Sequence, residues 1–392
     1  MPSGWRPGAP PRCWTPASDW PTASPTPRPK ARSRRQAVTE LTDPELPGAD
    51  FCRLHIARTI AETHDARSIE FDVPPELAER FRYRPGQFLT LRVPSDRTGS
   101  VGRCYSLSSA PHEGGPLKVT VKRVREGYGS NWLCDNAHPG MAIDVLPPGG
   151  VFTPKSLRAS LLLFAGGSGI TPVMSILKSV LAQDSGKVTL IYANRDERSV
   201  IFADELNALC AEQPDRLTVL HWLETVQGLP SVAQLAALAE PWSDREVFIC
   251  GPGAFMDAAA AAMTGLGVHR KRVHVEKFIS LSRNPFEVED TTEEVEPASA
   301  GGPVSLAVDL DGEQHTFAWP RQRKLLDFLL EKGLDAPYSC REGNCSACAC
   351  RIVSGEVKML NNEVLEPVDL DEGIVLACQS IPVTDDISVT YE

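Results

Sequence analysis

The chain has 392 residues, a formal net charge of −11 and 42% apolar residues, which suffices for two or three domains with real cores. Its apolar runs fall far short of the ~20 residues of a membrane span, and no signal peptide is visible. We therefore expect no membrane span and a cytoplasmic location, where eleven cysteines favour metal binding over disulfides. The acidic balance argues against nucleic-acid binding.

The N-terminal segment 1–47 differs from the rest in composition. Its first 36 residues hold seven Arg or Lys, one acid and nine prolines, so they carry about +6 and leave about −17 for the remainder. Such a segment buries too little apolar surface to fold. We expect a disordered tail or a start codon assigned too early; a targeting peptide or a nucleic-acid-binding arm is the alternative.

Residues 48–156 are typical of short strands. The runs are FCRLHIARTIAET, SIEFDV, QFLTLRV, CYSLSSA, LKVTVKRV and AIDVLPP, and Gly, Pro and Asp separate them. This pattern predicts a small antiparallel β-barrel or sandwich.

Residues 157–278 alternate between strand-like and helical segments. LLLFA leads through a glycine-rich turn to a helix from Pro172, and VTLIYAN, LTVLHWL and EVFIC precede helices expected around 202–212, 231–239 and 253–265. The alternation predicts an α/β domain with a parallel sheet covered by helices.

The last part of the chain follows an acidic segment, 279–303, which we interpret as a linker. Residues 304–392 begin with VSLAVDL-DG-EQHTFAW, a hairpin around an Asp-Gly turn. KLLDFLLEKG is a short helix closed by Gly333, and further short strands follow.

Four thiols in this last part carry the strongest chemical signal. Three are spaced Cys-x4-Cys-x2-Cys, a fourth follows in LACQS, and the set is Cys340, Cys345, Cys348 and Cys378. Four thiolates can hold two bridging irons, and this is the plant-type ferredoxin spacing for a 2Fe–2S cluster. Small residues around the cysteines let backbone amides approach the sulfurs. Cys378 is expected to come from a distant strand.

The alternatives to a cluster are a structural zinc site or inert buried cysteines. Zinc sites usually pair two short Cys-x2–4-Cys arms, whereas one arm here has three cysteines. Cys350 has no place in the spacing and is expected to fill the core. The last 90 residues resemble a plant-type ferredoxin domain, which implies an α+β (β-grasp) fold for 304–392.

RCYSLSS (103–109), with RPGQF upstream, resembles the Arg-x-Tyr-Ser flavin motif of the ferredoxin–NADP reductase family. The resemblance implies an FAD domain in which Arg103 pairs with the pyrophosphate, Tyr105 lies against the flavin ring and Ser106 reaches a ring nitrogen. It also implies contacts from four downstream residues: Val121, Lys122, Gly129 and Ser130. Taken alone, the motif fits a plain strand equally well.

AGGSGITP (165–172) directly follows the strand LLLFA. Glycines let a backbone approach a pyrophosphate, and the following helix offers its positive end, although a tight strand–helix turn is the alternative. The segment resembles the nicotinamide loop of the same family, and ICGPGAFM resembles its Cys-Gly-Pro turn. The implied cofactor-binding residues are Gly166, Gly167, Gly169, Thr171, Pro172, Cys250, Gly251 and Pro252. Cys250 would then lie near hydride transfer without acting as a nucleophile; its alternative role is a core cysteine.

Two further segments bear on the nicotinamide site. VHVEKF sits where the family places Glu-x-Phe, so Glu276 and Phe278 are implied at the flavin, with Phe278 shielding its face; a core strand end is the alternative. Asn194 and Arg195 follow the second strand, where a ribose 2′-phosphate would sit. Arg195 and Arg198 favour NADPH, whereas Asp196 and Glu197 would repel the phosphate. We expect NADH, with NADPH possible.

The three cofactors imply an order of electron flow. Nicotinamide gives two electrons as hydride, the cluster takes one, and flavin handles both, so flavin belongs between them. Terminal oxygenases of this type carry a Rieske site, but there is no Cys-x-His pair and the eight histidines form no ligand cluster. We therefore expect the chain to be the reductase of a separate Rieske-type terminal oxygenase.

The module order resembles the branch of phenylacetyl-CoA epoxidase reductases and 3-ketosteroid 9α-hydroxylase reductases. The resemblance covers about 50–392 and implies electron supply to a steroid-hydroxylating oxygenase. A reductase for a phenylacetyl-CoA or other aromatic-ring oxygenase is one alternative. A non-enzymatic redox sensor or carrier is another.

Overall fold

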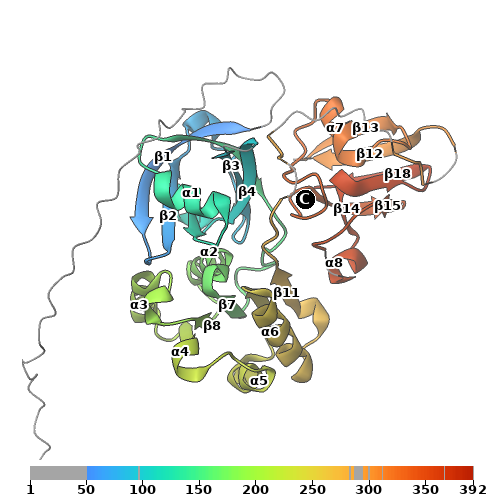
Figure 1. Cartoon of the computed structure of the whole chain (residues 1–392). Helices are drawn as coiled ribbons and strands as arrows, with labels where there is room; N and C mark the ends of the chain where they lie inside the picture. The colour runs from blue at the N-terminus through green and yellow to red at the C-terminus, as the bar shows by residue number, and fades with distance from the viewer. Residues whose placement is uncertain are drawn as a thin grey trace, which may run out of the picture. The chain divides into compact units, whose positions relative to one another are not determined.

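The computed structural model describes residues 51–95, 98–281, 284–286, 295–298, 301–310, 312–365 and 367–391. The chain divides into two units, Met1–Leu46 and Pro47–Glu392, and every described residue lies in the second. The expected tail and 12 of the 25 residues of the expected linker lie outside the described residues. Figure 1 shows the elements of the second unit. In the part of the chain that the structure describes, no helix has the length and apolarity to cross a membrane.

The first sheet is antiparallel and has six strands in the order β4-β3-β6-β1-β2-β5. A bridge between Leu107 and Val119 joins the segment after β4 to β5, so the two edges of the sheet meet as in a barrel. Inside lie the fully buried side chains of Leu54, Ile69 and Leu91. The elements are β1 Cys52–Ala61, β2 Ala66–Asp72, β3 Phe88–Ser95, β4 Gly99–Ser106, β5 Leu117–Lys122, α1 Tyr128–Asn136 and β6 Ala142–Gly149.

The second sheet is parallel, in the order β11-β10-β7-β8-β9. Along β7, Leu163 packs with α2 and α3, whereas its neighbours Leu162 and Phe164 pack with α5 and α6. Successive side chains point to opposite faces, so helices cover both sides. The elements are β7 Leu161–Gly166, α2 Ile170–Leu181, β8 Val188–Asn194, α3 Ala203–Glu212, β9 Leu217–Leu223, α4 Glu224–Gln227, α5 Val232–Ala239, β10 Glu246–Cys250, α6 Gly253–Gly265 and β11 Val273–Glu276.

The third sheet is mixed, in the order β13-β12-β18-β14-β16, and a second pair joins β15 to β17. Its core holds Trp319 with Leu325 and Leu329 of α7, and Gly333 ends that helix with a φ of +78°. The α/β, antiparallel-barrel and α+β expectations are thus confirmed. The elements are β12 Val304–Leu310, β13 Glu313–Trp319, α7 Leu325–Glu331, β14 Ala349–Ser354, β15 Val357–Met359, α8 Pro367–Asp371, β16 Ile374–Leu376, β17 Ser380–Pro382 and β18 Asp386–Thr390.

Two local expectations need correction. The strand expected over 104–110 runs instead from Gly99 to Ser106, because it pairs along its whole length with β3. Cys378 lies on a single 3-10 turn, Ala377–Gln379, between β16 and β17 and not on a strand. Arg103, Tyr105 and Ser106 still lie on β4.

Candidate functional site

The four predicted cluster cysteines meet in one loop region. Three lie between α7 and β14, the fourth lies on the turn after β16, and none is more than 7% exposed among Cys340, Cys345, Cys348 and Cys378. The Cys340 thiol lies next to those of Cys345 and Cys378, and the Cys378 thiol also neighbours Cys348. The fold therefore brings together all four sulfurs that the spacing singled out.

Backbone amides point at these sulfurs. The N–H groups of Glu342 and Asn344 each donate to Cys340 Sγ at 3.3 Å, and Cys378 N–H donates to Cys348 Sγ at 3.4 Å. Hydrogen bonds with the Cys345 and Cys378 thiols, followed by these amides, lower the pKa of Cys340 to about 3. A thiolate is the form that binds iron, and the loop favours this form at Cys340, whereas burial raises the pKa of Cys345 and the neighbouring Cys340 and Cys348 thiols raise the pKa of Cys378.

The donor set fits a 2Fe–2S cluster. Elsewhere in the described segments, no set of three or more His, Cys, Asp or Glu is arranged to hold a metal ion. The thiols neighbour one another in the order Cys345, Cys340, Cys378, Cys348, and four adjacent cysteines are the ligand set of a plant-type 2Fe–2S cluster. Cys350 lies on β14 opposite Val375, with its thiol near the Tyr391 hydroxyl.

The predicted flavin motif occupies the end of β4. Side chains alternate along the strand, so Arg103 and Tyr105 share one face while Cys104 and Ser106 share the other. Arg103 lies against the start of α1: a Cβ on Gly129 would stand 2.9 Å from Arg103 Cγ.

Val121 and Ser130, two residues predicted to contact the flavin, already contact protein groups. Val121 is fully buried inside the barrel, so only its backbone is available to a ligand. The Ser130 hydroxyl accepts a hydrogen bond from Val124 N–H at 3.1 Å. Tyr105 packs against the barrel core, and burial raises its pKa. Arg103, Gly129 and Ser130 nevertheless lie together at one helix start, which is a phosphate-type environment.

The glycine-rich loop packs tightly on the Cys-Gly-Pro turn. A Cβ on Gly169 would stand 2.1 Å from the carbonyl oxygen of Cys250, so only glycine fits there. Thr171 Oγ1 donates to Ser168 O at 3.1 Å, and Thr171 and Pro172 are buried within the first turn of α2. Cys250 is fully buried at the end of β10, and burial raises its pKa.

A cavity of about 350 Å³ opens beside this loop. Six predicted residues line it: Lys122, Gly166, Gly167, Asn194, Arg195 and Pro252. Gly169, Thr171, Pro172, Cys250 and Gly251 are not in its wall. Sequence reasoning missed other wall residues: Trp222, Glu224 and Leu229 come from segments without a motif, whereas Phe255 lies within ICGPGAFM but was not singled out.

Asp65 is a missed residue with a clear electrostatic role. Its carboxylate lies 3.1 Å from Lys122 Nζ and 3.8 Å from the Arg195 guanidinium. Asp196, by contrast, accepts a hydrogen bond from the Ser199 hydroxyl at 2.8 Å. No motif marked Asp65, since it lies in the turn between β1 and β2.

A second, small cavity of about 40 Å³ is lined by the barrel strands β3 and β4, the segment at the end of β11 and the cluster loop. Its wall combines four predicted site residues, Ser106, Glu276, Phe278 and Cys345, with Cys104 and Asn344, which no motif singled out. Burial raises the pKa of Glu276, the register neighbour of Cys250, to about 8. Phe278 is 51% exposed, which excludes the alternative of a core residue.

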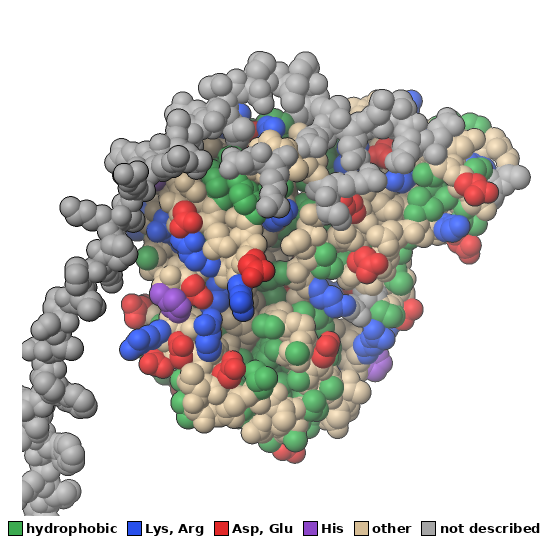
Figure 2. Space-filling model, viewed as in Figure 1, with side chains coloured by type: hydrophobic (Ala, Val, Ile, Leu, Met, Phe, Trp, Pro, Cys, Tyr) green, Lys and Arg blue, Asp and Glu red, His purple; other side chains and the backbone are tan. Residues whose placement is uncertain are grey.

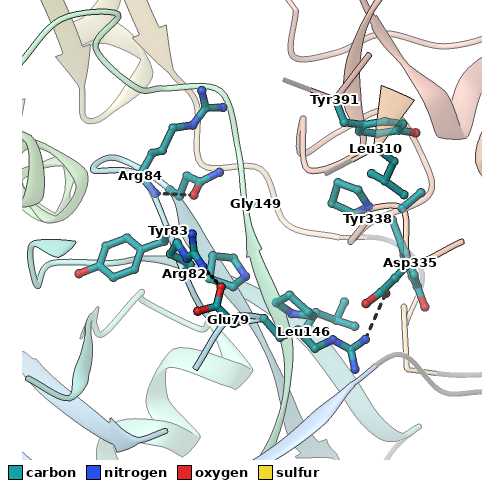
Figure 3. A pocket seen from close by; sticks show the side chains of 16 residues that line it. Glu79, Arg82, Tyr83, Arg84, Leu146, Gly149, Leu310, Asp335, Tyr338 and Tyr391 are labelled. Atoms are coloured by element: carbon teal, nitrogen blue, oxygen red, sulfur yellow. Dashed lines mark hydrogen bonds and ion pairs between the residues drawn. The ribbon is translucent and has the colours of Figure 1, made fainter. Parts of the chain in front are cut away.

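A third cavity, about 840 Å³, is shown in Figure 3. Segments 79–87 and 146–149 form one wall, and residues 335–338 with Tyr391 form another. An ion pair of 3.2 Å joins Arg80 of the first wall to Asp335 of the second. None of the predicted site residues lines this cavity.

Three family models match the chain. They are an oxidoreductase FAD-binding domain at residues 53–153, an oxidoreductase NAD-binding domain at 163–261 and a 2Fe-2S iron-sulfur cluster binding domain at 308–383. The chain therefore carries FAD-binding, NAD-binding and 2Fe-2S ferredoxin domains, as the motifs predicted.

Full-length relatives place the chain more narrowly. It is 55% identical over 352 residues, covering 90% of this chain and 100% of the relative, to the "3-ketosteroid-9-alpha-monooxygenase, ferredoxin reductase component" of Rhodococcus rhodochrous. The chain belongs to this ferredoxin reductase family. It is 33% identical, over 87% of this chain and 98% of the relative, to one of the subunits of the 1,2-phenylacetyl-CoA epoxidase from Escherichia coli strain K12.

A solved structure shares the arrangement. Phthalate dioxygenase reductase, described as a modular structure for electron transfer from pyridine nucleotides to 2Fe-2S, matches with a TM-score of 0.52 and 28% identity. The match covers 87% of this chain and 98% of that one. As a member of the family, the chain is an oxidoreductase, the reductase component of a monooxygenase system with an oxygenase partner.

Proposed function

We propose that this protein takes hydride from NADH and delivers single electrons to a separate Rieske-type oxygenase that hydroxylates 3-ketosteroids at C9. FAD binds in 48–156, the nicotinamide in 157–278 and the cluster in 304–392, with 279–303 as the linker. The observation that carries this proposal is the 55% identity over the whole length of a steroid-system reductase component. The cytoplasm is the proposed location.

The residues have distinct proposed roles. Arg103, with Gly129 and Ser130 at the start of α1, holds the flavin pyrophosphate, and Ser106 bonds a ring nitrogen. The loop at Gly166 and Gly167 receives the nicotinamide pyrophosphate. FAD, when bound, supplies the exchange between two-electron and one-electron chemistry.

The preference for NADH is supported by the charges at the 350 Å³ cavity. Asp65 lies within 4 Å of both Lys122 and Arg195, and Glu224 adds a carboxylate to the wall. A 2′-phosphate binds best to a cation whose charge is not already neutralised. We expect kcat/KM to be higher for NADH than for NADPH, and the two values measured side by side decide this point.

Reconstitution tests the substrate class. The purified holoprotein is combined with NADH and a candidate steroid oxygenase, and hydroxylated product is measured by mass spectrometry. A matched reaction with a phenylacetyl-CoA oxygenase tests the alternative suggested by the 33% identical relative. Product only in the second reaction, or in neither, would refute the steroid assignment.

A turnover assay also distinguishes a reductase from a non-enzymatic redox sensor or carrier. A sensor or carrier would show slow turnover with NADH and ferricyanide or cytochrome c, whereas a reductase turns over fast. This assay needs no oxygenase, so it separates the reductase function from the choice of partner.

A further inference from the structure

A polar contact links the barrel to the cluster loop. Thr90 Oγ1 on β3 lies 2.7 Å from Ser339 Oγ and 3.4 Å from Cys104 Sγ on β4. Cys104 Sγ lies 3.8 Å from Ser339 Oγ, which completes a triangle of three side chains. Ser339 directly precedes Cys340, and Cys104 stands between Arg103 and Tyr105.

The surroundings of this triangle are apolar. Phe88, Leu281 and Ala347 pack with Cys340 and Cys345 in the same cluster of buried residues. Thr90 and Ser339 are only 1% and 2% exposed. A buried hydroxyl costs free energy unless it is hydrogen-bonded, so each of the two hydroxyls depends on the other. The pairing therefore fixes one position of the loop against the barrel.

The triangle also lies between the two predicted redox sites. Cys104 and Cys345 line the same small cavity with Ser106. Tyr105 is the sequence neighbour of Cys104, the Cys104 side chain contacts that of Ser339, and Ser339 is the sequence neighbour of Cys340. These three steps connect the flavin motif to the cluster loop. We find no motif that assigns Thr90, Cys104 or Ser339 to any role.

We propose that Thr90, Cys104 and Ser339 form the contact that positions the cluster loop for electron transfer from the flavin-binding strand. This inference rests on the proposed function. The hydride from NADH would bring two electrons and one proton to the flavin, and the cluster would take the electrons one at a time. Reoxidation of the flavin would release the proton to solvent, and the oxygenase would accept both electrons.

Rapid mixing tests the proposal. Holoprotein with Thr90→Val, Ser339→Ala or both is mixed anaerobically with NADH, and flavin and cluster absorbance are followed separately. We expect each single change to slow cluster reduction about tenfold and the double change to add little, since residues in contact do not act additively. Flavin reduction by NADH should keep its wild-type rate.

Two further measurements separate positioning from general damage. The low-temperature paramagnetic resonance spectrum and the reduction potential of the cluster should be unchanged, because its thiolates are intact. Ser339→Thr, which keeps the hydroxyl, should restore most of the rate. Ser380→Ala is the matched control, since this buried serine of the same domain donates to Leu376 O instead.

Unchanged cluster reduction in both single variants would overturn the proposal. Equal slowing of flavin and cluster reduction would also overturn it, because the triangle would then support the flavin site itself. Should Ser339→Ala fail to fold, Thr90→Val in the barrel provides the same test. A wild-type protein without flavin or cluster would contradict the proposed function before this comparison begins.

Discussion

Gly149, at the end of β6, lies directly against Ala347 of the cluster loop: a Cβ on Gly149 would stand 2.8 Å from the Ala347 Cβ. Its distance to the Ala347 Cα would be 3.1 Å, so backbone as well as side chain stands in the way. The barrel therefore meets the loop at a position where only hydrogen fits. Figure 2 shows one face of the described surface.

Gly149→Ala should push the cluster loop off the barrel. Overpacking of this kind costs about 1–3 kcal/mol. We expect a lower melting temperature and slower cluster reduction after mixing with NADH, while flavin reduction is unchanged. Gly253→Ala is the control, since its Cβ would meet nothing within 4 Å. Equal cluster reduction rates in the two variants would show that the approach at Gly149 is not needed.

Loss of any predicted cluster cysteine should abolish the cluster and leave FAD in place. The variants are Cys340→Ala, Cys345→Ala, Cys348→Ala and Cys378→Ala, and iron content with visible absorbance is the measurement. Cys350→Ala is the matched control, because Cys350 lies on β14, outside the cluster loop, and its thiol is near Tyr391. A cluster lost from Cys350→Ala would overturn this choice of ligands.

Arg103→Ala should weaken retention of FAD. Its guanidinium lies at the start of α1, where a pyrophosphate would gain a charge-assisted hydrogen bond of about 1.5–3 kcal/mol. The affinity for FAD should fall roughly tenfold or more, so less flavin should stay bound after gel filtration. Arg158→Ala, at an exposed arginine, removes the same charge elsewhere. Full flavin content in Arg103→Ala would count against the pyrophosphate assignment.

Spacing made much of this site predictable. The cysteine loop and the glycine-rich turn depend on residues close in sequence, so their chemistry can be read from local order. β4 was placed too late because its first half, Gly99–Gly102, lacks large apolar residues and is held by pairing with β3. Local propensity cannot supply that pairing.

Contacts across the sheets were not predictable in this way. Thr90 and Ser339 are 249 positions apart, and Asp65 is far in sequence from Arg195. No local pattern marks such pairs, since each residue alone is compatible with an ordinary strand or turn. The predicted site residues lie in motifs, whereas the contact between Thr90 and Ser339 leaves none.

Glu276 should make stability depend on pH. The accessible part of its side chain faces the 40 Å³ cavity with Cys345, and burial raises its pKa from 4.5 to about 8. The contribution of the neutral carboxyl to the free energy of unfolding is fully present below about pH 4.5 and is lost as the pH rises through 8, because the unfolded state ionises first.

Glu276→Gln keeps the shape and cannot ionise, so it should remove this loss. We expect the variant and the wild type to have the same melting temperature at pH 5. At pH 8.5 the variant should melt at the higher temperature, by roughly 2–4 °C for each kcal/mol of unfolding free energy that it retains and the wild type loses. Melting of the holoprotein followed from pH 5 to 8.5 is the measurement, and Glu240→Gln at an exposed site is the control. Parallel profiles for wild type and Glu276→Gln would mean that this carboxyl is already ionised in the folded protein at neutral pH.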